Sequence, residues 1–181
     1  MAIIDKDDIK IFLGIIDTGS DALLDVLAIR SCAMIESFCN RKFEKDSFAE
    51  RFCGDGSSKF YAQNLPLEFG ATEKIEIEDE DDILEADVHA FVDSGIIKLK
   101  NRVLTLDSLC TVTYKGGFET VPEDVKHATV EIAALLFNRN KSTGIKSESD
   151  GPVSVTYDDS GISELPAVSA VIEFYRIPNF E

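Results

Sequence analysis

Two stretches near the start of the chain repeat apolar residues with the 3.6-residue period of an α-helix. The first spans Asp5 to Leu13, where Asp5 can cap the helix and Gly14 can end it. The second runs from Ser20 or Asp21 to about Asn40. Its apolar positions share one helix face: Leu24, Leu27, Ala28, Ile35 and Phe38. The pattern therefore predicts two amphipathic helices that pack on each other.

The apolar period then shortens to that of β-strands. Residues Ser47 to Cys53 alternate, Gly54-Asp55-Gly56 is a tight-turn signal, and Lys59 to Ala62 follows, so the pattern predicts a hairpin. Further strand-like runs are Lys74–Glu78, Gly95–Leu99 and Leu109–Tyr114. Several short strands between turns predict a small antiparallel sheet inserted between helices.

A helical pattern returns at Val121-Pro122-Glu123-Asp124, where proline and two acids suit a helix start. This third helix should run to about Asn138. Residues 140–163 are polar and glycine-rich apart from one strand-like island, Val153–Tyr157, and we interpret them as a mobile arm. A last helix is predicted from Leu165 or Pro166 to Tyr175.

These elements predict an α+β fold, a helical bundle of about four helices with an inserted small antiparallel β-sheet subdomain. We expect an N-terminal helical pair over residues 1–46 and the β subdomain over residues 47–118. The C-terminal helices, with the mobile arm at 140–163, then occupy residues 119–181. The helical parts should form one core.

The charge of the chain narrows the possible partners. Among 181 residues, 34 acidic side chains face 18 basic ones, which gives a formal net charge of −16. Such a chain repels phosphates, so a dedicated DNA binder and a protein that docks on anionic membranes are both disfavoured. The longest strictly apolar run, Ile132–Phe137, is too short to span a bilayer, and the first residues do not resemble a signal peptide. We expect a soluble, acidic, cytosolic globular protein.

The candidate chemistry is sparse. The histidines, His89 and His127, lie in no nucleophile motif, and the spacing of His127 predicts a position on a helix surface. The four cysteines form no Cys-x-x-Cys pair, and we expect reduced, mostly buried thiols. The acidic run Glu76–Asp82 lacks the glycine of a calcium loop, which favours a solvated loop between strands. We predict no catalytic, cofactor or metal site.

Two small basic patches, Arg41-Lys42-Phe43 and Arg139-Asn140-Lys141, end predicted helices. Positive charge at a helix C-terminus complements the helix dipole. Contact with DNA phosphates or with an acidic partner is the alternative interpretation.

The order of the segments carries a resemblance. Two helices end in Ile35-Glu-Ser-Phe-Cys-Asn-Arg-Lys-Phe43, a strand pair turns at Gly54-Asp55-Gly56, and Tyr114-Lys-Gly-Gly-Phe118 leads through Val121-Pro-Glu-Asp124 into an alanine-rich helix. Over roughly residues 3 to 160, this order resembles the tailed-bacteriophage head–tail connector family, whose members are also called adaptor or head completion proteins and also occur in prophages.

The resemblance implies a structural protein rather than an enzyme. About a dozen copies would form a ring under the portal protein, extend the DNA conduit and offer a platform to a stopper or tail-completion protein. Double-stranded DNA would pass through the lumen without specific binding. Such a protein would be assembled in the bacterial host cytoplasm and would reside in the virion neck.

The resemblance also implies that the C-terminal segment grips the portal. The candidate docking residues are Phe174, Tyr175, Arg176, Ile177 and Phe180. Aromatic side chains at this density are unusual for a solvated tail, and the alternative is that they fold back onto the protomer's own core. Two other functions stay open, a small acidic metal-dependent hydrolase that uses the acidic run and a monomeric binding module of the host.

Overall fold

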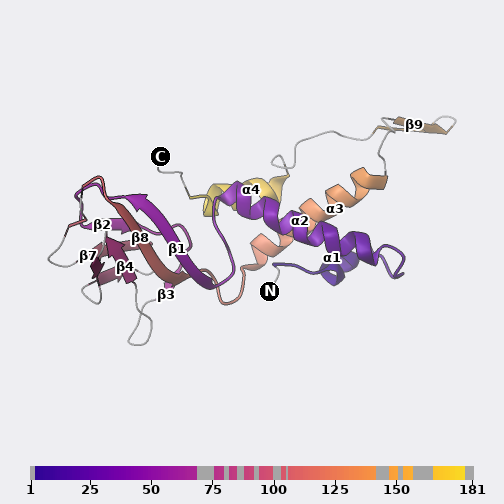
Figure 1. Cartoon of the computed structure of the whole chain (residues 1–181). Coiled ribbons are helices and arrows are strands. Elements are labelled where there is room, and N and C mark those ends of the chain that lie inside the picture. Colours follow the sequence, from indigo (N-terminus) through magenta and orange to yellow (C-terminus); the bar gives the residue numbers. More distant parts are fainter. Residues whose placement is uncertain are drawn as a thin grey trace. The chain divides into compact units, whose positions relative to one another are not determined.

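The computed structural model describes residues 3–68, 76–79, 82–84, 88–91, 94–99, 103–104, 106–141, 147–150, 153–156 and 165–177. The chain divides into two compact units. The helical unit combines residues 1–40 with residues 121–181, and the β unit comprises residues 41–120. The β unit is therefore an insertion between two parts of the helical unit, and the predicted α+β class is confirmed (Figure 1).

The helical unit is built around two long helices. Helix α2 packs against α1, α3 and α4, and α3 also contacts α1 and α4 (Figure 1). Their bounds are α1 Lys6–Leu13, α2 Asp21–Cys39, α3 Glu123–Lys141 and α4 Pro166–Tyr175. All four were predicted, although α3 continues three residues beyond the expected end at Asn138. No helix in the described part of the chain is long and apolar enough to cross a membrane.

Local signals set the ends of α1 and α2. The Asp5 carboxylate accepts hydrogen bonds from the backbone N–H groups of Asp7 (2.8 Å) and Asp8 (3.1 Å), and the Asp8 carboxylate accepts one from the Asp5 N–H. This reciprocal capping satisfies N–H groups that have no partner inside the helix. Gly14 (φ +68°) and Asn40 (φ +52°) adopt the left-handed conformation that ends each helix.

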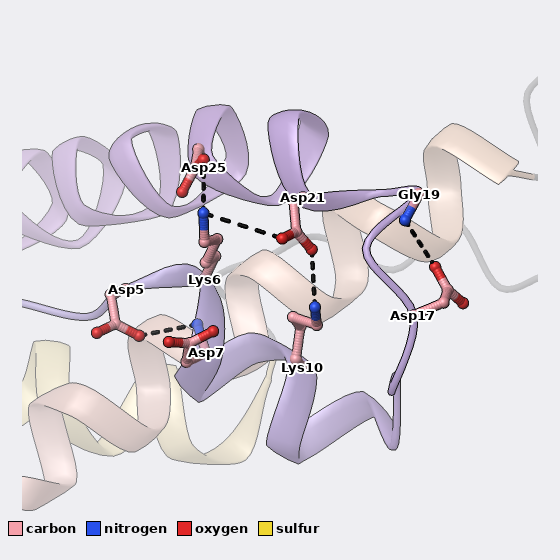
Figure 2. Close-up of polar contacts among 8 residues, drawn as sticks. All are labelled: Asp5, Lys6, Asp7, Lys10, Asp17, Gly19, Asp21 and Asp25. Carbon is pink, nitrogen blue, oxygen red and sulfur yellow. Dashed lines mark hydrogen bonds and ion pairs between the residues drawn. The ribbon is translucent and has the colours of Figure 1, made fainter.

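Lysines of α1 meet carboxylates of α2. Lys6 Nζ lies 3.3 Å from Asp25 and 4.0 Å from Asp21, and Lys10 Nζ lies 2.7 Å from Asp21. Figure 2 shows both lysines directed from α1 toward the start of α2. Ion pairs near the surface contribute little to stability. These three contacts link α1 to the first two turns of α2.

The core of the helical unit comes from the inward faces of the helices. Its buried side chains include Ile9, Leu24, Leu27, Ala28, Ile35, Val125, Ala128, Ile132, Phe137, Val168 and Val171. Two buried hydroxyls bond to their own helices, Ser31 to the carbonyl of Ala28 and Thr129 to the carbonyl of Val125. These bonds remove the cost of burying an unsatisfied polar group.

The β unit contains two antiparallel sheets. One has the order β1-β8-β4-β5, with β3 also paired to β8, and the other has the order β2-β7-β6. The strands are β1 Asp46–Cys53, β2 Lys59–Tyr61, β3 Leu67–Glu68, β4 Glu76–Asp79, β5 Asp82–Leu84, β6 Val88–Phe91, β7 Ile96–Leu99 and β8 Leu109–Gly116. The shared core between them contains Leu67, Ile97, Leu99, Leu104, Cys110, Val112 and Tyr114.

The predicted hairpin between residues 47–53 and 59–62 is wrong. Strand β1 pairs over its whole length with β8, and β2 pairs with β7 in the other sheet. The backbone after β1 pairs with the residues that precede β8. The Gly54 N–H donates to the carbonyl of Ser108 (2.8 Å), and the Gly54 carbonyl accepts from the Asp107 N–H (2.8 Å). The Ser57 carbonyl accepts from the Leu104 N–H (2.8 Å). The glycine-rich turn thus moves the chain from one sheet to the next instead of reversing it.

The segment predicted as an arm contains regular structure. Strands β9, Ser147–Asp150, and β10, Val153–Thr156, form an antiparallel hairpin. The strand-like island at 153–157 is confirmed, whereas β9 has no apolar alternation and was not predicted. Residues 142–146, 151–152 and 157–164 lie outside the described residues, so the predicted mobility of the arm stays a prediction.

Candidate functional site

The C-terminal segment begins with α4. The first residue of this helix is Pro166, a residue type that suits a helix start. Val168 and Val171 bury this helix against the rest of the bundle. After Tyr175 the backbone becomes extended at Arg176, whose N–H still donates to the carbonyl of Ile172 (3.1 Å). Residues 175–177 therefore leave the helix in a defined direction.

Hydrogen bonds hold this segment on the bundle. The Tyr175 hydroxyl donates to the Asp124 carboxylate at the start of α3 (3.1 Å). The Ile177 N–H donates to the carbonyl of Cys39 (3.0 Å), and the Asn40 amide donates to the carbonyl of Ile177 (3.5 Å). The Cys39 carbonyl is one of the last in α2 and has no partner within that helix. The segment thus closes the C-terminal end of α2.

The five candidate docking residues consequently differ in what they offer a partner. Phe174 is 79% exposed, with its ring edge-on to that of Tyr175 at 4.8 Å between centroids. Arg176 is also exposed, whereas Tyr175 and Ile177 are half-buried and bonded to the bundle. Phe180 lies outside the described residues. The alternative that the segment folds back onto its own bundle therefore describes Tyr175 and Ile177, whereas the docking role of the segment stays a prediction.

The two histidines weighed for catalysis belong to different units. His127 is exposed on α3, 3.5 Å from Glu131 and edge-on to Phe12, as its spacing predicted. His89 lies in β6 opposite Lys98. The described residues contain no group of three or more histidine, cysteine, aspartate or glutamate side chains placed to hold a metal ion.

The acidic run overlaps the strand predicted at Lys74–Glu78, because Glu76 to Asp79 form β4. Asp82 opens β5 with Asp79 as its cross-strand partner. The solvated loop predicted for the whole run is therefore wrong at these five positions. The four cysteines are free thiols; Cys39 and Cys110 are buried, Cys32 is half-buried and Cys53 is exposed.

Arg41 directly follows the C-cap of α2, as predicted, but its side chain is not solvated. It is buried, with its guanidinium 5.2 Å from the Phe43 ring centre and 5.4 Å from that of Phe118. It also donates to the carbonyl of Leu65. The stacking on two rings draws the side chain inward, so it is a structural cation–π contact of the β unit. The other basic patch behaves as predicted, since Arg139 lies in the last turn of α3.

A buried polar cluster in the β unit was missed. The Tyr114 hydroxyl donates to the Glu50 carboxylate and accepts from the backbone N–H of Asn64 (3.0 Å). Glu50 also accepts from the Asn64 amide (3.0 Å) and from the Gln63 N–H (3.3 Å). Burial raises the pKa of Glu50 and of Tyr114 above their ordinary values. Tyr114 follows Cys110 and Val112 on the inward face of its strand, and an inward tyrosine there signals a polar partner.

The comparisons with known proteins agree with each other. The chain matches the family model described as "Head completion protein" over residues 2–177. No curated protein matches the sequence. Several solved structures share the fold, and they come from gene transfer agent (GTA) particles.

Three of these structures show the extent of the likeness. A chain from the "Neck of empty GTA particle computed with C6 symmetry" is 14% identical with a TM-score of 0.62, and the match covers 99% of this chain and 92% of that one. A chain from the native GTA virion is 15% identical (TM-score 0.61; 97% and 88% covered). A chain from the native neck computed with C12 symmetry is 17% identical (TM-score 0.54; 97% and 92% covered). Because the family model spans nearly the whole sequence, the chain belongs to the head completion protein family.

Proposed function

We propose that this protein is a structural head–tail connector of a tailed phage or a related particle. The observation that carries the proposal is the family match over residues 2–177. The likeness to neck chains over almost the whole fold supports it. The protein would sit under the portal as a ring of about a dozen copies and join the head to a stopper or tail protein.

The charge of the chain suits a conduit wall. With a net charge of −16, a ring would present an excess of carboxylates to DNA phosphates. Like charges repel, so DNA would pass through the lumen without binding to it. No observation favours the alternative of a metal-dependent hydrolase, because Glu76–Asp79 and Asp82 lie in strands and the described residues form no metal-binding group.

The direct test deletes the gene for this protein, so that particles assemble without it. Without it, electron micrographs should show DNA-filled heads and free tails in place of joined particles, and a plasmid copy should restore joining. Joined particles in its absence would overturn the proposal. Pulldown of purified portal would then test the finer assignment, in which the exposed side of the C-terminal segment contacts the portal.

A further inference from the structure

Helix α2 is apolar on two opposite sides. Its buried side packs into the helical unit, as described above. On the other side, Ala22, Val26, Ile29 and Ala33 follow one another at intervals of four, three and four residues, and all four are exposed. Ile29 is 69% exposed. A surface helix ordinarily carries polar residues on its outward side. In the part of the chain that the structure describes, nothing covers this second apolar stripe.

An unmatched cation borders the stripe. The Arg30 side chain is exposed, and among the described residues it takes part in no hydrogen bond or ion pair. We call Ala22, Val26, Ile29, Arg30 and Ala33 together the α2 surface. It is apolar with one positive charge.

Helix α1 offers a surface of the complementary kind. Ile11 is 81% exposed, and Asp7 lies one turn before it on the same side of the helix. Ile16, in the loop that follows, is also exposed. We call Asp7, Ile11 and Ile16 the α1 surface. It is apolar with a negative charge.

We infer that the α2 surface of one copy packs against the α1 surface of the next copy. The inference rests on the proposed function, in which several copies lie side by side. Two different, complementary surfaces on one chain make a head-to-tail contact, which builds a ring when the rotation between neighbouring copies closes on itself. The charges favour a second copy, because Arg30 meets Asp7 at a contact where the strong repulsion between acidic copies is locally balanced.

Disulfide trapping tests which surfaces meet. The full chain carrying Asp7→Cys and Arg30→Cys, with the exposed Cys53 and the half-buried Cys32 both replaced by serine, would be concentrated at high salt and mildly oxidised. The inferred contact gives a ladder of trimers and larger species on non-reducing gels. Each single variant gives dimers at most, because one accessible cysteine cannot extend a chain of copies. A double variant without species larger than those of the single variants would overturn the inference.

Two matched substitutions that each place a glutamate on the surface test how much the contact contributes to self-association. Ile29→Glu should weaken salt-induced self-association at least tenfold in sedimentation, whereas Leu109→Glu should not, although Leu109 in β8 is similarly exposed at 66%. Circular dichroism would verify that both variants fold. Equal association of the two variants, or no association of the parent chain at any salt concentration, would overturn the contact. Neither result would alter the head-joining test, so a failure of this inference and a failure of the proposed function are distinguishable.

Discussion

At the scale of single residues, the cluster around Glu50 makes the stability of the β unit depend on pH. Burial raises the pKa of this carboxyl above its ordinary value of 4.5, and the hydrogen bonds from Tyr114, Gln63 and Asn64 oppose that rise only in part. A carboxyl whose pKa is higher in the folded than in the unfolded state disfavours folding when it ionises. Its stabilising contribution is complete below the unfolded pKa and is lost as the pH rises through the folded pKa.

Glu50→Gln should reveal this dependence, because glutamine stays neutral at every pH. The free energy of unfolding of the variant, relative to the parent, should increase as the pH rises from about 4 to about 7. Urea unfolding at a series of pH values measures it. A difference that stays constant or falls over this range would contradict the assignment, and near-ultraviolet circular dichroism would control for an altered core.

The residue scale also shows what sequence patterns leave out. Tyr114 could be placed on the inward face of its strand, but its partners Glu50 and Asn64 lie 64 and 50 positions earlier in the chain. The burial of Arg41 could not be predicted either, because Phe118, one of the two rings beside its guanidinium, lies 77 positions later in the chain. Contacts of this range depend on strand pairing, and no local pattern encodes it.

At the scale of elements, two glycines with positive φ differ in what surrounds them. Gly14 ends α1 at φ +68°, and a Cβ there would meet nothing within 4 Å. Gly117 follows β8 at φ +91°, and a Cβ there would lie 2.4 Å from the backbone oxygen of Glu44. Both positions require a positive φ, but only at Gly117 would a Cβ also clash with neighbouring atoms.

Gly14→Ala should therefore cost about 1 kcal/mol of stability, the usual penalty for placing a Cβ in the left-handed region. Gly117→Ala should cost at least about 1 kcal/mol more, because the backbone of Glu44 cannot move away without breaking its own pairing with Phe118. Chemical denaturation of both variants measures the difference. Equal costs would mean that the chain adjusts easily around Gly117.

The C-terminal segment separates stability from docking. Phe174→Ala should change the free energy of unfolding by less than about 0.5 kcal/mol, because the ring is exposed. If the ring fills a pocket on the portal, its loss should weaken binding by about 2 kcal/mol, roughly 30-fold. A chain that stops after Arg176 should instead melt earlier, since it loses the Ile177 bond to Cys39. Unchanged portal binding of Phe174→Ala would place the gripping surface elsewhere.

The helices, whose ends have local sequence signals, were predicted well, whereas the pairing of the strands was not. The capping residue Asp5, the end at Gly14 and the proline that opens α4 all act within a few residues, so the helices could be placed. The turn at Gly54 resembles a hairpin turn in its residues. Its true role is set by Ser108 and Leu104, some fifty residues later. The candidate docking segment was located, but which of its residues bond to the bundle depends on the end of α2.

At the scale of the whole molecule, the net charge of −16 opposes self-association. The isolated chain should sediment as a monomer at about 20 mM salt, where repulsion extends over roughly 20 Å, and should associate at high concentration near 0.5 M salt, where screening is nearly complete. Analytical ultracentrifugation across this range measures the effect. A ring that formed at micromolar concentration in low salt without the portal would contradict the electrostatic argument.

The insertion of the β unit between two parts of the helical unit has a consequence for synthesis on the ribosome. All residues of the β unit are contiguous, so it can fold as soon as residue 120 has emerged. The inward face of α2 waits for α3, roughly 100 residues later, which takes about 5–20 s at ordinary rates of translation. During that interval Leu24, Leu27 and Ile35 are open to other nascent chains. Slower translation through residues 41–120 should therefore increase aggregation of this protein.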